Sequence, residues 1–545
     1  MILHLNKSVF RKGELHRLQS SLERPYVQAF LPPFSSFDYI RQHFPKVGIS
    51  LQRCFSLARS FNCQSVVYEK IPPVGMIAEE NDYLREISAV SDEYVHRVSF
   101  WRKRIWWAWM LRFCRDKDLI GYAIVKHDSG IVSGEYVDSW YVFESVFVKY
   151  EHEHNCVSNQ GLFSLKVGVK VFHIKGVLYC QQNNITTKCA HVAVRSLLSR
   201  FSSDGDLSYT QIHNLARESM AKQGLCYYPN KGLSARTIID VIHGLGYECN
   251  AKDYELLEKK DLLRIADRVY DPYQSYLYAG VESGAGALLG FRCYNSSGKA
   301  VGKHIIPICG HTFNKDTWVS DADSSYLMVT RSFGYMRSEN WTSSFIGHDD
   351  NFGPNYCIPR GYMKPTDVTF VLSVQFPNER LQARIAEPAA LAIMMAIIAH
   401  NTDNLFDNEW VKRLWDAIPL RKCVLRTIYV SAKDYCEYVG AAQDWKGNKE
   451  GKSVRDIISG KVGDVDLLVV EFSIAQLFPA NERKVGEVVF GASRPLTRNP
   501  NYPYGFEFLL VRLPKVLVCP EVGRPPRSRL ISSSIQSHLP LIKKK

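Results

Sequence analysis

Residues 179–201 of the 545-residue chain, YCQQNNITTKCAHVAVRSLLSRF, join a strand-like segment to an amphipathic helix. Apolar residues recur at positions i, i+3, i+4 and i+7 from Ala190 onward, which is the spacing of one buried helical face. Thr187 suits the N-cap, because its hydroxyl can accept a hydrogen bond from a free N–H of the first turn. This pattern predicts that Cys189 lies in the first turn of a core helix.

A cysteine in this position has two interpretations. The helix dipole favours a negative charge in the first turn, and the thiolate is the nucleophilic form of cysteine. A free cysteine also commonly fills a core as a small apolar side chain. The choice between a nucleophile and a core residue depends on whether residues further along the chain can act as a base for Cys189 and orient that base.

Two polar residues mark the ends of later strand-like runs. His304 opens the apolar run HIIPICG, and Asp321 ends the run DTWVSD. A histidine on one strand and a carboxylate on its neighbour can meet side by side, so that the carboxylate fixes the imidazole tautomer. The chain order Cys189, His304, Asp321 therefore predicts a thiol nucleophile, a histidine base and an orienting carboxylate.

Residues 175–330 resemble the papain-like cysteine peptidase superfamily, most closely the C39-like peptidases of bacteria. The resemblance rests on Gln182 before Cys189, on the later GLS element at 232–234, on the histidine strand that ends in glycine, and on Asp321.

This resemblance implies a role for each matching residue. Cys189 would be the nucleophile, His304 the general base and acid, and Asp321 the residue that orients the histidine. Gln182 and the backbone N–H of Cys189 would form the oxyanion hole.

The match leaves alternatives at three positions. Gln182 lies seven residues before the cysteine, where papain-type enzymes commonly have six. Asn183 lies at the nearer spacing, and Gln181 is also available. His311 is a rival base, and Asp323 is a rival orienting residue.

The chain is long enough for about three domains. We expect an N-terminal α/β region at 1–165, a papain-like domain at 166–375, a C-terminal α+β domain at 376–522 and a flexible basic tail at 523–545. The papain-like segment has its helices first and its strands second, which indicates an α+β fold.

Composition bears on the cellular compartment of the protein and on the kind of partner that it binds. The 14 cysteines form no CxxC pair, which argues against a zinc knuckle, and scattered thiols suit a reducing compartment. The apolar run PAALAIMMAIIA at 388–399 is too short to span a bilayer, so we expect a buried helix there. We therefore expect a soluble, cytoplasmic protein without a membrane span. The formal charge of +13 suits an anionic partner.

Residues 101–113, WRKRIWWAWMLRF, interleave tryptophans with basic side chains. Such a pattern can stack nucleic-acid bases or lie at a membrane interface. We favour a helix packed between other elements, because its apolar residues occupy more than one face.

His348, Asp349 and Asp350 are three consecutive polar residues before a Gly-Pro turn. They could bind a metal or a cationic substrate group, although turns favour such residues in any case.

The sequence thus predicts a cysteine peptidase that cleaves a peptide or isopeptide bond in a protein or peptide substrate. A transglutaminase-like acyl transferase would use the same residues, since the outcome depends on which nucleophile reaches the acyl-enzyme. An inactive papain-like scaffold that binds nucleic acid or protein is the other alternative. No cofactor is expected, and the oligomeric state is left open.

Overall fold

The structure is a computed structural model, and it describes most of the chain between residues 14 and 542. The residues outside this description are 1–13, 31–35, 45, 47, 133, 150–154, 158–159, 187–188, 202–205, 227–231, 256–272, 314–326, 330–333, 376–382, 442–455, 457, 464, 479–481, 494–506, 515, 522–523, 531–537 and 543–545. The described residues form a mixed α and β structure with several sheets.

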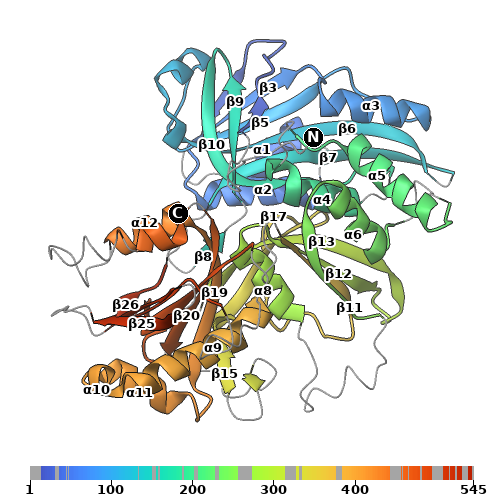
Figure 1. The fold of residues 1–545 in the computed structure, drawn as a ribbon. Coiled ribbons are helices and arrows are strands. Elements are labelled where there is room, and N and C mark those ends of the chain that lie inside the picture. Colours follow the sequence, from blue (N-terminus) through green and yellow to red (C-terminus); the bar gives the residue numbers. More distant parts are fainter. Residues whose placement is uncertain are drawn as a thin grey trace, which may run out of the picture.

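The first sheet belongs to the N-terminal third of the chain (Figure 1). Its described strands are β1 (Glu14–Arg17), β2 (Tyr26–Ala29), β3 (Ser65–Ile71), β4 (Val90–Ser91), β5 (Val95–Trp101), β6 (Leu119–Val132), β7 (Glu135–Val148), β9 (Gly161–Val167) and β10 (Lys170–Tyr179). They run in the order β1-β9-β10-β7-β6-β5-β3-β2, with β4 paired to β6. Described pairs are antiparallel except β1 with β9, so the N-terminal region is not a parallel α/β sheet.

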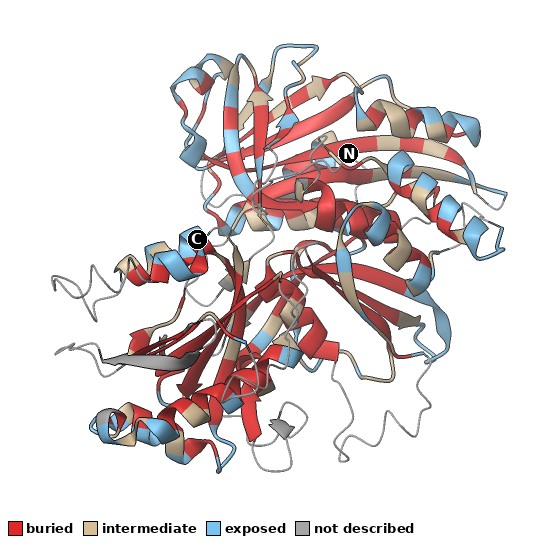
Figure 2. Cartoon of the chain, in the orientation of Figure 1, coloured by how far each residue is buried: buried red, intermediate tan, exposed pale blue. Residues whose placement is uncertain are grey.

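Both faces of this sheet are covered. Val66 and Val67 are neighbours on β3 and point to opposite faces, and they belong to different apolar clusters. The helices around this sheet are α1 (Ser36–His43), α2 (Ile49–Ser60) and α3 (Met76–Glu86). Figure 2 shows the resulting buried residues along the strands. The sheet continues to Tyr179, beyond the boundary that the sequence predicted at residue 165, because β9 and β10 pair with each other and with β7.

Most strands of the second sheet follow a group of helices, as the sequence predicted, and one short strand precedes them. These helices are α4 (Cys189–Leu198), α5 (Tyr209–Lys222), α6 (Ala235–Gly244) and α8 (Tyr273–Ser283), with a 3-10 turn η3 (Ser199–Phe201). The described strands are β8 (Asn155–Val157), β11 (Glu248–Asp253), β12 (Ala287–Tyr294), β13 (Ala300–Phe313), β16 (Thr342–Asp349), β17 (Gly353–Pro359) and β18 (Val368–Gln375). Their order is β11-β18-β12-β13-β16-β17, with β8 on β13.

The alternating side chains of β13 show which helices cover each face of this sheet. Ile305 packs in a cluster with α4, α5 and α6, whereas Ile306 packs in a cluster with α8. Successive side chains of a strand point to opposite faces, so α4 and α8 lie on opposite faces of the second sheet. Figure 1 shows α2 and α4 between the first sheet and the second.

The third sheet belongs mainly to the C-terminal part. Its described strands are β14 (Leu327–Val329), β15 (Gly334–Arg337), β19 (Cys423–Ser431), β20 (Asp466–Ile474), β22 (Gly486–Gly491), β23 (Leu510–Leu513), β24 (Val516–Glu521) and β25 (Arg524–Leu530), in that order. The accompanying helices are α9 (Ala383–His400), α10 (Thr402–Leu405), α11 (Glu409–Ala417) and α12 (Ala432–Ala441). The apolar run at 388–399 lies within α9 and packs in the core, as predicted. No helix in the described part of the chain is long and apolar enough to cross a membrane.

Strand pairing in this region crosses the predicted domain boundaries. Residues 334–337 fall within the predicted central domain at 166–375, but β15 pairs in parallel with β19 of the third sheet. The flexible tail predicted at 523–545 contains β25, which pairs with β24. It also contains β26 (Leu539–Pro540), which pairs with β21 (Arg483–Lys484). Leu539 and Ile542 are buried, so apolar side chains anchor the described end of this segment.

The prediction of a packed helix at 101–113 is also wrong. Trp101 ends β5, and the later residues form a short 3-10 helix, η1 (Ala108–Phe113), followed by η2 (Asp116–Asp118). Trp106, Trp107 and Trp109 are between 50% and 61% exposed. Arg104 lies over the ring of Trp106, and the tryptophans therefore form part of a basic, aromatic surface.

Gly280 in α8 is a position where the structure allows no side chain. A Cβ there would lie 2.4 Å from the carbonyl oxygen of Gly286. We expect Gly280→Ala to destabilise the protein by about 1–3 kcal/mol, because the backbone of α8 would have to move off the sheet. The matched control is Gly460→Ala, an exposed helical glycine with open space around it. There alanine should be neutral or stabilising by up to about 1 kcal/mol. Chemical denaturation of both variants tests this, and equal effects would contradict it.

Candidate active site

Cys189 is the first residue of helix α4 and its side chain is half-buried. The first backbone N–H groups of a helix have no partner within the helix, so a thiolate or an oxyanion there meets free donors. The remaining residues of α4 are buried. Helix and position agree with the sequence prediction, while the N-cap proposed at Thr187 lies outside the described residues.

Helix α4 is fixed by a buried ion-pair network that reaches into the first sheet. Arg195 is fully buried, and its guanidinium donates to Glu144 at 2.7 Å and to Asp206 at 3.2 Å. Arg17 binds the same two carboxylates. Burial raises the pKa of Asp206, but the charges of Arg195 and Arg17 outweigh it and lower the pKa to about 2. The network is therefore charged at neutral pH and holds α4 in one position.

His304 lies on β13, which packs against α4, and only 8% of the residue is exposed. The ring of Phe291 on the neighbouring strand meets the imidazole edge-on, with centroids 5.4 Å apart. The interaction with Cys189 is one of the causes that raise the pKa of His304, so the thiol lies near the imidazole. The structure thus places near each other the two residues for which the sequence predicted the roles of nucleophile and base.

Two carboxylates approach the same imidazole. His304 Nε2 is 2.9 Å from Oδ1 of Asp350 and 3.4 Å from Oδ1 of Asp349, and the Asn351 amide lies 3.3 Å away. Burial lowers the pKa of His304, but hydrogen bonding to Asp349, Asp350 and Cys189 outweighs it and raises the pKa to about 12. The imidazole is therefore charged at neutral pH.

The N-terminal region holds the turn that carries these carboxylates. The hydroxyl of Tyr179, at the end of β10, donates to Ser50 at 2.8 Å and to the backbone carbonyl of Asp350 at 3.4 Å. Arg53 of α2 donates to the carbonyl of Asn355 at 3.0 Å. Gly353 has a φ of 104°, and a Cβ there would lie 2.7 Å from Arg53. Helix α2 and strand β10 therefore position the turn.

His348 does not join this cluster, although the sequence grouped it with Asp349 and Asp350. Its Nδ1 accepts a hydrogen bond from the Asn355 N–H at 3.1 Å, and its ring packs edge-on against Tyr179. Burial lowers the pKa of His348 to about 3, so it is neutral. The cationic group that the two aspartates contact is the imidazolium of His304.

The orienting carboxylate predicted at Asp321, and its rival Asp323, lie outside the described residues. Among the described residues, Asp349 and Asp350 contact the histidine. The sequence signal that could have identified them is the turn between two strands, since a hairpin beside β13 returns its turn residues to the edge of the histidine strand.

The three candidates for the oxyanion donor differ in their contacts. The Gln181 side chain accepts from the Val142 N–H at 2.9 Å. Asn183 accepts from the N–H of Thr186 and donates to Glu80. Gln182 lines a cavity of about 340 Å³ between α3 and α5, and Cys189 is not among the residues that line it. Val192 of α4, three residues after Cys189, also lines this cavity.

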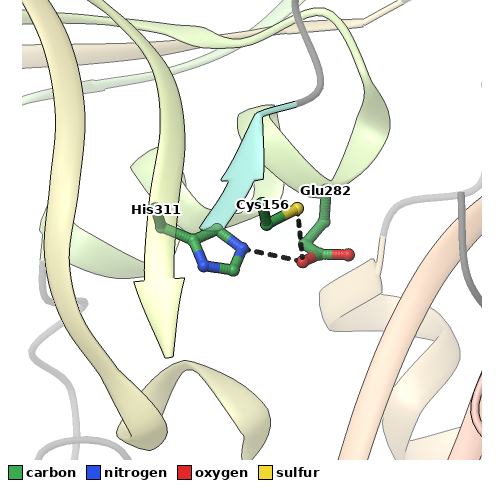
Figure 3. A group of neighbouring side chains, drawn as sticks. All are labelled: Cys156, Glu282 and His311. Carbon is green, nitrogen blue, oxygen red and sulfur yellow. Dashed lines mark hydrogen bonds and ion pairs between the residues drawn. The ribbon is translucent and has the colours of Figure 1, made fainter. Parts of the chain in front are cut away.

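His311, the rival base, faces a different cysteine. Its Nε2 lies 2.8 Å from Glu282, and its ring is grouped with Cys156 and not with Cys189 (Figure 3). Burial lowers the pKa of His311, but the charge and hydrogen bonding of Cys156 and the hydrogen bond of Glu282 outweigh it and raise the pKa to about 9. Two clusters of the described chain could hold a metal ion: this one, and His304 with Asp349 and Asp350.

No family model matches the chain, and neither a curated protein nor a solved structure does so. The site therefore has to be interpreted from its own geometry.

Chemically, the arrangement combines a thiol, an imidazolium and two carboxylates at the N-terminus of a helix. A thiol beside a charged imidazole is the pattern of an activated cysteine nucleophile. The backbone N–H groups of the first turn of α4 can donate to an oxyanion formed at Cys189.

We expect Tyr179→Phe to slow alkylation of Cys189 by iodoacetamide at pH 6 by roughly fivefold. The variant loses a hydroxyl that holds the Asp350 carbonyl, and one hydrogen bond contributes about 1 kcal/mol. Mass spectrometry of the labelled Cys189 peptide measures the rate. The control is Tyr294→Phe, which removes an exposed hydroxyl bonded to Asp367. If both variants label at the wild-type rate, the N-terminal region does not position the site.

Proposed function

We propose that the protein is a cysteine peptidase or a related thiol acyl transferase, in which Cys189 is the nucleophile and His304 the acid and base. The observation that carries this proposal is the placement of Cys189 near the imidazole of His304, with two carboxylates on Nε2 of that imidazole. Asp350 is the principal orienting residue, since it makes the shorter contact.

The first half of the reaction forms an acyl-enzyme. The Cys189 thiolate attacks the carbonyl carbon of a peptide or isopeptide bond, and the tetrahedral oxyanion is stabilised by N–H groups at the start of α4. The C–N bond then breaks, and the His304 imidazolium gives its proton to the departing amine. A thioester on Cys189 and a free amine are the products.

The second half releases the acyl group. Water, or the amine of a second molecule, attacks the thioester as His304 accepts its proton, and the Cys189 thiolate leaves. Water gives hydrolysis, whereas an amine gives transfer. His304 then carries the proton again, and Asp349 and Asp350 balance its charge.

A second oxyanion donor is also required by comparison with papain-like enzymes. Gln182 and Gln181 are the remaining candidates, because the Asn183 amide N–H donates to Glu80, whereas the contact of Gln181 with Val142 uses only its oxygen. The papain-like architecture is part of this proposal.

The pH profile of Cys189 alkylation tests the proposal. An ordinary thiol with a pKa of about 8.5 reacts roughly 200-fold more slowly at pH 6 than at pH 9. Because the pKa of His304 is raised to about 12, the imidazole is charged at both pH values and can stabilise the thiolate at both. We expect wild-type labelling to differ by less than about tenfold between them, and His304→Ala to restore the steep profile.

The controls separate Cys189 from its neighbours. Cys189→Ala gives the labelling blank. Cys293→Ser removes a half-buried thiol whose charge is coupled to His304 and Cys189, and it should leave the profile flat. A steep profile in both wild type and His304→Ala would make Cys189 a core residue. If instead the wild-type profile is flat, digestion of a peptide library by wild type but not by Cys189→Ala would identify the scissile bond.

The exposed aromatic surface favours a second candidate function. We propose that Trp106, Trp107 and Trp109 stack the bases of a single-stranded nucleic acid, while neighbouring arginines contact its phosphates. Arg104 and Arg112 lie over the rings of Trp106 and Trp109, so cations and aromatic faces are presented together. This combination is typical of sequence-tolerant single-strand binding.

We expect a fluorescent single-stranded oligonucleotide to bind, with an affinity that falls steeply as salt rises. Trp107→Ala should cost about 1–3 kcal/mol of binding free energy through lost stacking. The control is Tyr136→Ala, an exposed aromatic on β7. Fluorescence anisotropy measures both. Binding to anionic lipid vesicles without binding to the oligonucleotide would contradict this function.

A further inference from the structure

A second group of reactive side chains lies away from Cys189. Cys156 comes from β8, Glu282 from α8 and His311 from β13, and Figure 3 shows the three pointing toward one another. His311 Nε2 lies 2.8 Å from Glu282 Oε1, and Cys156 Sγ lies 3.9 Å from the same oxygen. The three donor atoms are all within 4.8 Å of one another.

The Cys156, Glu282 and His311 side chains are largely shielded from solvent. His311 is fully buried and Glu282 is 3% exposed, while Cys156 is half-buried. Tyr278 lies against the imidazole, with ring centroids 5.0 Å apart and an angle of 33° between the planes. A site that collects sulfur, nitrogen and oxygen donors inside the protein is suited to a metal ion.

Glu282 is oriented by a further partner. Its second oxygen, Oε2, lies 3.7 Å from Arg426 of β19, and Arg426 also pairs with Glu471 at 2.6 Å. Arg426 therefore leaves Oε1 directed at Cys156 and His311. A charged group that orients a metal ligand is a common support for metal sites.

We propose that Cys156, Glu282 and His311 bind a divalent ion of borderline softness, with zinc as the best match. Thiolate, imidazole and carboxylate are the ligands that zinc takes in proteins. Two ligands of a tetrahedral zinc ion lie about 3.3–3.8 Å apart, given bonds of about 2.0–2.3 Å. The two distances from Glu282 Oε1 fall on either side of this range, so a shift of less than about 1 Å completes the site.

The ion would join separate parts of the chain. Strand β8 has three residues and pairs with β13 in three positions, so its own hydrogen bonds hold it weakly. The chain continues from β8 into β9 of the first sheet, whereas His311 and Glu282 belong to the second sheet and its helix. With three protein ligands, a fourth position remains for water or an exogenous ligand. This proposal does not depend on the activity of Cys189.

The test is cobalt binding to the metal-free, full-length protein. A thiolate bound to Co²⁺ gives an intense charge-transfer band in the near ultraviolet. We expect one equivalent of Co²⁺ to produce this band, and Zn²⁺ to displace it. Cys156→Ser should abolish the band and weaken Zn²⁺ binding by about 100-fold or more. Cys357→Ser, which removes an exposed thiol elsewhere, should retain both.

The cluster of His304, Asp349 and Asp350 could also hold a metal ion, and variants beside it distinguish it from the Cys156 site. Cys189→Ala and His304→Ala leave Cys156 and its partners intact, so the band should persist in both. A band lost with His304→Ala but kept in Cys156→Ser would overturn the proposal and place the metal beside Cys189.

A measurement on wild-type protein covers the case in which Cys156→Ser does not fold. We expect saturating Zn²⁺ to protect Cys156 from alkylation by at least about tenfold, because a metal-bound thiolate is not free to react. Labelling of the exposed Cys357 should not change. Absence of protection, or equal protection of both cysteines, would overturn the site.

Discussion

The buried charges around Arg195 are the constraint on which the candidate site depends. Arg195 belongs to α4, whereas Glu144 and Arg17 belong to the first sheet. Removing one partner from a buried ion pair typically costs about 3–5 kcal/mol, because a charge is left unbalanced. The position of α4, and with it the position of Cys189, is therefore tied to the N-terminal sheet as firmly as to the sheet that carries His304. The same region also holds the Asp350 turn through Tyr179. The N-terminal third of the chain is thus a structural component of the site, and a fragment of residues 166–375 would lack it.

The two cysteine clusters lie on the same strand of the second sheet. His304 and His311 are both on β13, and an odd separation of seven residues would place them on opposite faces of a regular strand. The strand has an irregular register with β16 between Ile308 and Gly310. His304 lies opposite Phe291, which belongs to the cluster on the α8 face, and His311 contacts Glu282 of α8. One strand thereby supplies an imidazole to each of two sites with different partners, one open to reaction at a helix N-terminus and one closed around three donor atoms.

Local patterns in the sequence predicted a large part of this arrangement. The strand at Ala287–Tyr294 and the start of α4 at Cys189 follow from periodicity and turn residues. The pairing of Cys189 with His304 was a prediction from chain order. The role of Asp350 could not be predicted in this way, because it depends on how far a hairpin folds back along β13. The exposure of Trp107 was also missed, since an apolar composition predicts burial and does not show that a short 3-10 helix turns its rings outward. The pairing of β15 with β19 joins residues far apart in the chain, and no local pattern records it.

The central claim is that His304 is an imidazolium beside Cys189, held in that state by Asp349 and Asp350. The most direct test is nuclear magnetic resonance of protein labelled with nitrogen-15 in its histidines, with the His304 signals assigned from His304→Ala. The account predicts that His304 remains protonated from pH 6 to about pH 10, since its pKa is raised to about 12, and that Asp350→Asn lowers the titration midpoint. A wild-type His304 that loses its proton near the ordinary value of about 6.5 would contradict the account.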